Sequence, residues 1–96
     1  MTEPTRPYVT AEYLKTPEDV RGYLAAVLED GTPAEIVQAI GIAARAQGIS
    51  DVAKAAGLNR QNLYRALSGD GRPEFATIIS ALRALGVKLT AEREAA

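Results

Sequence analysis

Residues 59–68 carry side chains that can hydrogen-bond to the edges of DNA bases. An arginine can donate two hydrogen bonds to O6 and N7 of guanine, and a glutamine can pair in the same bidentate way with N6 and N7 of adenine. Each such contact discriminates against a wrong base by about 1–3 kcal/mol. A tyrosine beside them can meet a thymine methyl group or a phosphate. The candidate base-reading residues are Arg60, Gln61, Tyr64 and Arg65.

Other polar residues around this segment suit the sugar-phosphate backbone of DNA. Contacts to phosphates fix the position of a protein on the duplex but carry no sequence information. The candidate phosphate contacts are Ser50, Asn59, Asn62, Ser68 and Arg72. Taken alone, Arg60 or Arg65 is more often an ordinary solvated side chain, and Tyr64 is as readily a half-buried packing residue. Their interpretation therefore depends on the element that carries them.

The spacing of small and apolar residues across residues 49–68 predicts a helix-turn-helix, two helices joined at Gly57. Ala53 is small because the second helix crosses close to it, and Gly57 lacks a Cβ because the turn needs a positive φ. Apolar side chains hold such helices at a fixed angle. Here they are Val52, Ala56, Leu58, Leu63 and Ala66. The complete spacing is far more specific than any one of these residues.

The second helix of the motif directs the candidate residues outward. With Leu63 at the centre of the buried side and about 100° per residue, Ala66 and Leu67 also fall on the buried side. The residues that fall opposite are Gln61, Tyr64, Arg65 and Ser68. A helix fits the major groove of DNA, and its N-terminal residues reach the base edges. We therefore predict a recognition helix that Asn59 caps and that ends at residues 68–71.

Start and stop signals predict two helices before the motif. Thr16 and Thr32 are each followed by a proline and acidic residues, a combination typical of helix starts. The first helix is expected to end at residues 30–31 and the second near residues 47–48. Gly41, inside the second helix, indicates the close approach of another backbone. The two predicted buried stripes are Val20, Tyr23, Leu24, Val27 and Leu28, then Ile36, Val37, Ile40, Ala43 and Ala44.

The remaining segments complete an all-α, compact bundle of about five helices. Ser50 is expected to cap the first helix of the motif. Pro73 is expected to start the last helix, which Gly86 closes, with Phe75, Ile78, Ile79, Leu82 and Leu85 on the core. One short turn within residues 8–14 is expected to cover the core with Tyr8, Val9, Tyr13 and Leu14. Residues 87–90 alternate apolar and polar, which fits a short strand, an extended dimer contact or a frayed end over the core.

Composition excludes several classes of protein. The 96 residues include neither cysteine nor histidine, which removes disulfides, thiolate chemistry, zinc fingers and histidine acid–base catalysis. We find no catalytic residues, no metal site and no cofactor motif, so an enzyme is not expected. No signal peptide or membrane-spanning stretch is present, so a cytoplasmic location is expected.

The charges are unevenly distributed although the net charge is only −1. Residues 1–30 carry three cations against six carboxylates, whereas residues 42–72 carry five cations against two carboxylates. The basic surplus lies on the predicted helix-turn-helix, and the acidic N-terminal third suits a basic protein partner. We divide the chain into an N-terminal arm and helix (1–31), a helix-turn-helix DNA-binding domain (32–90) and a mobile tail (91–96).

Longer stretches of the sequence resemble a known family. They are A-E-Y-L-K-T-P-E-D-V-R-G-Y-L at 11–24, A-I-G-I-A-A-R-A-Q-G-I-S-D-V-A at 39–53, G-L-N-R-Q-N-L-Y-R-A-L-S-G-D-G-R-P-E-F at 57–75 and L-R-A-L-G-V-K-L-T at 82–90. Together they resemble the addiction-module antidote family, small HigA-like proteins with a Cro/Xre-type helix-turn-helix. The resemblance implies a lambda-repressor-like fold with an N-terminal helical extension. It also implies an antitoxin that represses its own operon and neutralises a HigB-, RelE- or ParE-like toxin.

One position departs from the wider Cro/Xre pattern. Many of those proteins start the first helix of the motif with a polar pair that holds a phosphate, but here the aligned residues are Gly48 and Ile49. Ile49 is expected to pack inward. The phosphate contact then passes to Ser50 and to the free N–H groups of the helix start.

These observations lead to a hypothesis with two rivals. We expect a homodimer that binds a palindromic operator in double-stranded DNA, because one half-site offers too few base contacts for useful specificity. A cognate toxin is the second expected partner, met by the acidic N-terminal arm and helix. A stand-alone Xre-type repressor would share every DNA-binding residue and lack only the toxin. A protein-interaction module with a decayed motif would not need the basic residues at positions 60 and 65.

Overall fold

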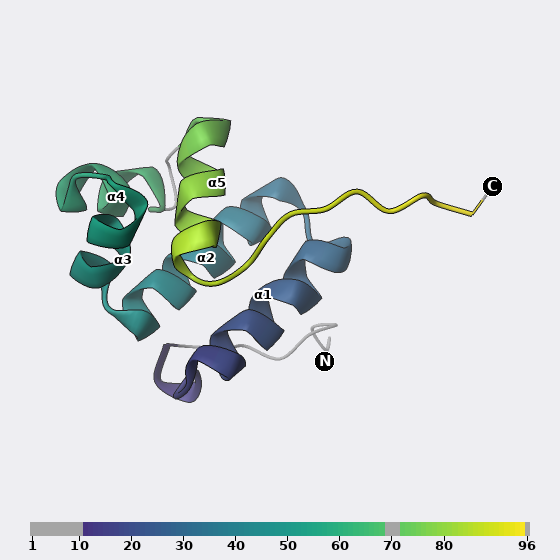
Figure 1. Cartoon of the computed structure of the whole chain (residues 1–96), viewed down its shortest axis with the longest axis horizontal. Coiled ribbons are helices and arrows are strands. Elements are labelled where there is room, and N and C mark those ends of the chain that lie inside the picture. Colours follow the sequence, from purple (N-terminus) through teal and green to yellow (C-terminus); the bar gives the residue numbers. More distant parts are fainter. Residues whose placement is uncertain (1–10, 69–71, 96) are drawn as a thin grey trace, which may run out of the picture.

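The computed structural model describes residues 11–68 and 72–95, which form five α-helices and one short turn (Figure 1). They are η1 (Ala11–Tyr13), α1 (Pro17–Asp30), α2 (Pro33–Gln47), α3 (Ile49–Ala56), α4 (Arg60–Ala66) and α5 (Phe75–Ala84). These two described ranges contain no strand, so the predicted all-α bundle of about five helices is confirmed. The predictions for Tyr8, Val9 and the rest of residues 1–10 lie outside the described residues.

The same capping box begins both α1 and α2. Thr16 Oγ1 accepts a hydrogen bond from the amide of Asp19 at 3.0 Å, and the Asp19 carboxylate accepts one from the amide of Thr16 at 3.1 Å. In α2, Thr32 Oγ1 and the amide of Glu35 are 3.1 Å apart, and Glu35 Oε1 and the amide of Thr32 are 3.0 Å apart. Each box satisfies two backbone N–H groups that no helical carbonyl can reach. Both helices therefore start where the sequence predicts.

One hydrophobic core joins the five α-helices. Its largest fully buried side chains are Val20, Leu24, Ile40, Val52, Leu63, Leu82 and Leu85. α1 and α2 lie side by side, and α3 packs against α2, α4 and α5. No helix in the described part of the chain has the length and apolar character needed to cross a membrane.

Gly41 lies where α2 meets the end of α4. A Cβ added at this position would stand 2.9 Å from the carbonyl oxygen of Leu67 and 3.5 Å from the Cβ of Leu67. The predicted close approach of another backbone is therefore confirmed. Gly57, between α3 and α4, has a φ of +72°, which confirms the predicted positive-φ turn.

The start of α3 differs from the prediction that Ser50 caps it. Gly48, with a φ of +111°, follows the last residue of α2 and precedes the first residue of α3. α3 therefore begins at Ile49, which places Ser50 in its first turn, and no side chain caps this helix. Gly48 connects the two helices directly. Ser50 therefore has helical backbone angles and cannot serve as the N-cap, which needs an extended conformation.

Two aromatic residues predicted to cover the core are exposed. Phe75 is 71% exposed, because α5 starts at Phe75 rather than at Pro73 and its first residue lies beyond the core. Tyr13, the last residue of η1, is 67% exposed, whereas Leu14 packs against the core as predicted. Ile79 is only half-buried.

The segment after α5 forms no strand in the single chain. Val87 packs against the core, and its amide donates a hydrogen bond to the carbonyl of Leu82 at 2.9 Å. From Lys88 to residue 95 the chain is exposed and has no regular structure. Of the three interpretations of residues 87–90, the short strand is absent from the single chain, and only Val87 lies over the core.

We expect Gly41→Ala to lower the free energy of unfolding by up to about 2 kcal/mol. The added methyl group must push α2 away from the end of α4, and overpacking of this kind costs about 1–3 kcal/mol, more than the roughly 1 kcal/mol that alanine contributes to a helix. Urea unfolding followed by circular dichroism, at one fixed protein concentration, measures the difference.

Gly22→Ala is the matched control for this substitution. Gly22 lies inside α1, and a Cβ there would meet nothing within 4 Å. We expect this variant to be more stable than the wild type by about 0.5–1 kcal/mol. If Gly41→Ala were stabilised to the same extent, α2 and α4 would not be in the close contact described here.

Candidate nucleic-acid interface

Two buried leucines and one cap hold α4 in place. Leu63 is fully buried, and Leu67, just after the helix, is 4% exposed. At the start of α4, Asn59 Oδ1 accepts hydrogen bonds from the amides of Gln61 and Asn62, at 2.8 and 3.2 Å, which confirms the predicted cap. A helix of seven residues is too short to be stable alone. Its orientation therefore depends on this packing and on this cap.

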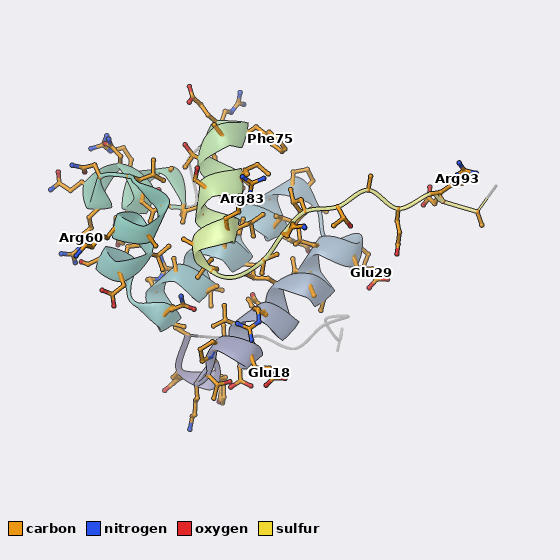
Figure 2. All side chains as sticks on the ribbon, viewed as in Figure 1. Glu18, Glu29, Arg60, Phe75, Arg83 and Arg93 are labelled. Atoms are coloured by element: carbon orange, nitrogen blue, oxygen red, sulfur yellow. The ribbon has the colours of Figure 1, made fainter. Side chains whose placement is uncertain are left out.

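The four candidate base-reading residues all lie on α4 and are all open to solvent. Arg60, Gln61 and Arg65 are exposed, and Tyr64 is 56% exposed. Figure 2 shows Arg60 directed away from the helices that form the core. Leu63 faces the core, and the exposed residues of α4 carry two guanidinium groups, two carboxamides and one phenol.

The candidate phosphate contacts are less uniform. Ser50, Asn62 and Arg72 are exposed, so their polar groups are open to a ligand. The hydroxyl of Ser68 donates a hydrogen bond to the carbonyl of Arg65 at 2.8 Å and would have to leave it to reach a phosphate. The Oδ1 atom of Asn59 is occupied by the cap, so only its Nδ2 group is open to an anion.

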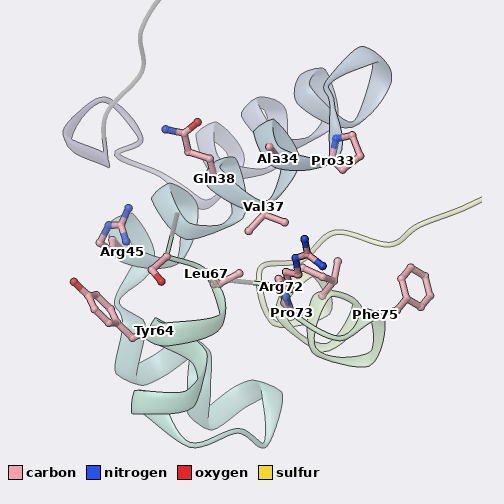
Figure 3. A pocket seen from close by; sticks show the side chains of 12 residues that line it. Pro33, Ala34, Val37, Gln38, Arg45, Tyr64, Leu67, Arg72, Pro73 and Phe75 are labelled. Carbon is pink, nitrogen blue, oxygen red and sulfur yellow. The ribbon is translucent and has the colours of Figure 1, made fainter. Parts of the chain in front are cut away.

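Arg45 is a cation beside α4 that was missing from the predicted site. It belongs to α2 and lines a hollow of about 960 Å³ with Tyr64, Ser68 and Arg72. Figure 3 shows Arg45 and Tyr64 on one side of this hollow and Arg72 on the other. Gly41 could have revealed Arg45, because Arg45 follows it by one helical turn. A Cβ at Gly41 would lie 3.8 Å from a guanidinium nitrogen of Arg45.

The start of α3 is a mixed environment for a phosphate. Ile49 is partly buried and packs against the core as predicted, and no side chain caps the first N–H groups of the helix. These N–H groups favour an anion. Asp51 lies in the same turn and is exposed, and its negative charge opposes one.

Acidic side chains gather on a different element. Glu18 and Glu29 are exposed near the two ends of α1 (Figure 2). Asp19 is occupied by the capping box, where it accepts from the amides of Lys15 and Thr16. Within the described ranges, no three carboxylates come together as a metal site would require.

The chain is similar to known proteins over nearly its whole length. Residues 4–93 match the model of a family described as "Probable addiction module antidote protein". The chain is also similar to an uncharacterised protein of Haemophilus influenzae, with 37% identity over 93 residues, which cover 97% of this chain and 96% of the relative. No solved structure matches the chain significantly. The family match covers nearly the whole chain, so the protein belongs to the addiction-module antidote family.

Proposed function

We propose that this antidote is a sequence-specific DNA-binding protein that represses its own operon through α4. The observation that carries the proposal is the exposed side of α4, where Arg60, Gln61 and Arg65 lie together on a helix that Leu63 and the core hold in place. In the major groove these side chains can form bidentate hydrogen bonds to guanine and adenine. No comparable group of exposed donors lies on α1, which presents carboxylates.

The surrounding cations complete a surface for the DNA backbone. Arg45 and Arg72 line the hollow next to Tyr64, and arginines beside a helix in the major groove suit the phosphates that flank the groove. Lys54 is exposed on α3. Such contacts supply affinity that falls steeply with salt concentration, and the base contacts supply specificity.

We further propose that the protein binds as a homodimer to a palindromic operator. One seven-residue helix contacts only a few base pairs, whereas two helices related by a two-fold axis read two half-sites about one helical turn apart. The cytoplasm is the expected location, and the chain is expected to have no enzymatic activity, since it lacks histidine and cysteine.

The second proposed partner is a HigB-, RelE- or ParE-like toxin, bound through α1. An antidote must neutralise a toxin, and toxins that act on RNA or ribosomes need cations to meet phosphates. The exposed carboxylates Glu18 and Glu29 complement such a surface without interfering with α4. Membership of the antidote family favours this reading over a stand-alone repressor.

The Arg60→Ala, Arg65→Ala double variant is expected to bind the DNA upstream of its own gene at least about hundredfold more weakly than the wild type. Each lost base contact is worth roughly 1–3 kcal/mol. A gel shift at physiological salt measures the effect, with folding checked by circular dichroism.

The Lys15→Ala, Arg21→Ala double variant is the matched control. It also removes two positive charges, but from exposed positions just before α1 and within α1. We expect its affinity to stay within about threefold of the wild type, because salt screens charges that lie away from the DNA. Equal losses in the two double variants would mean that net charge, and not the face of α4, determines binding.

The Glu18→Lys, Glu29→Lys double variant is expected to associate with the purified toxin about tenfold more slowly at low salt, because surface charges at an interface act mainly on the association rate. Surface plasmon resonance at several salt concentrations measures this rate. Charge reversal is a cleaner test than deletion of α1, which contributes Val20, Leu24 and Val27 to the core.

The control for this experiment reverses two exposed carboxylates elsewhere. Glu74 precedes α5 and Glu94 lies near the C-terminus. The Glu74→Lys, Glu94→Lys variant should associate with the toxin at close to the wild-type rate. An unchanged rate in the α1 variant together with a slower rate in this control would assign the toxin to another surface.

A further inference from the structure

The chain after α5 leaves the body of the protein as an extended arm. Figure 1 shows residues 88–95, here called the C-terminal arm, running away from all five helices. Val87 is its anchor, since it packs against the core and hydrogen-bonds to Leu82. Beyond Val87, no described residue of the arm hydrogen-bonds to the body. Its backbone N–H and C=O groups are therefore open to pairing, as they are on the edge of a sheet.

The arm has the side-chain pattern of a strand with two different faces. In an extended segment, successive side chains point to opposite sides. One side of the arm carries Leu89, which is 40% exposed, and Ala91, followed by Arg93. The other side carries Lys88, Thr90, Glu92 and Glu94. The exposed apolar side chain of Leu89 can be buried only by a partner. The charges on the other side of the arm restrict which partner fits.

We propose that the C-terminal arm pairs with the same arm of a second copy, as an antiparallel two-stranded ribbon centred on Thr90. A two-fold axis at Thr90 places Lys88 opposite Glu92 of the second copy, and it does so twice. It also places Leu89 opposite Ala91 of the second copy and Thr90 opposite Thr90. Opposite charges, apolar pairs and threonine pairs are each favourable when directly opposite across strands. The arm is thus complementary to itself, as an isologous interface requires.

Neighbouring registers lose part of this complementarity. An axis at Leu89 places Lys88 opposite Thr90 and leaves Glu92 opposite Gly86. An axis at Ala91 pairs Lys88 with Glu94 but places Leu89 opposite the charged Arg93. Of these three axes, only the one at Thr90 pairs Lys88 with Glu92 and Leu89 with Ala91, although it also places Arg93 opposite Val87.

The size of the ribbon sets the strength of the dimer. Two short arms bury less surface than the roughly 1,200–2,000 Å² of a stable complex, so the free protein is expected to dimerise weakly. The inference rests on the proposed function in one respect, namely that operator DNA with two half-sites strengthens the dimer by holding both copies. Pairing of the arms itself requires neither DNA nor toxin.

Charge exchange between positions 88 and 92 tests the pairing in the full chain. Analytical ultracentrifugation without DNA should show at least tenfold weaker dimerisation for Lys88→Glu and for Glu92→Lys, because each places like charges opposite each other. The Lys88→Glu, Glu92→Lys double variant should regain the wild-type constant. Mixing the two single variants should also produce dimers, because each charge then meets its opposite.

Cross-linking tests the register independently. The chain has no cysteine, so Thr90→Cys introduces a single thiol, and across the axis the two Cβ atoms would be about 4.5–5.5 Å apart. Glu94→Cys is the control, since the two copies of position 94 would be roughly 26 Å apart. Mild oxidation should give a disulfide-linked dimer for Thr90→Cys only.

Three results would overturn the proposal. The first is equal cross-linking at positions 90 and 94. The second is a dimerisation constant that neither single charge variant changes. The third is an arm that becomes protected from proteolysis only when the toxin is added. These measurements contain no DNA, so they can succeed even if the protein does not bind its operator. If they fail, the proposal that α4 binds DNA is unaffected.

Discussion

The position of α4 depends on the close contact between its end and α2. At Gly41 the two backbones approach so nearly that a Cβ would lie 2.9 Å from the carbonyl oxygen of Leu67. α4 has only seven residues, so it cannot hold its own conformation in water. The buried side chains of Leu63 and Leu67, the cap at Asn59 and the missing side chain at Gly41 therefore determine together where the exposed side of α4 points. A helix that contacts base edges must be held rigidly, because hydrogen bonds to bases tolerate little displacement.

The same contact gathers charge around α4. Arg45 lies one turn after Gly41 on α2, so the packing that brings α2 against α4 also brings a cation beside Tyr64. The carboxylates of α1 remain exposed on a separate element, although α1 shares the core. One small core thus supports a cationic face and an acidic face, and this separation would let an antidote contact DNA and toxin on different surfaces.

Most of the fold could be predicted from the sequence, because local signals mark its helices. The repeated Thr-Pro starts, the glycine turn at position 57 and the apolar stripes have short-range causes. The errors arose where tertiary context decides. Gly48 replaces a polar cap by joining two helices, and Phe75 is exposed because the core ends before the first turn of α5. The exposed side of α4 followed from helical periodicity, whereas Arg45 entered the candidate site only through the packing of α2.

A nuclear magnetic resonance titration of the labelled protein with the DNA upstream of its gene tests the central claim most directly, since it locates the DNA on the folded chain without any substitution. Our account predicts that the largest shifts fall on the exposed residues of α4, with Arg45 among those that follow, and that the acidic ends of α1 hardly change. Shifts concentrated on α1 or on the C-terminal arm, with α4 unaffected, would contradict the claim that α4 reads the operator.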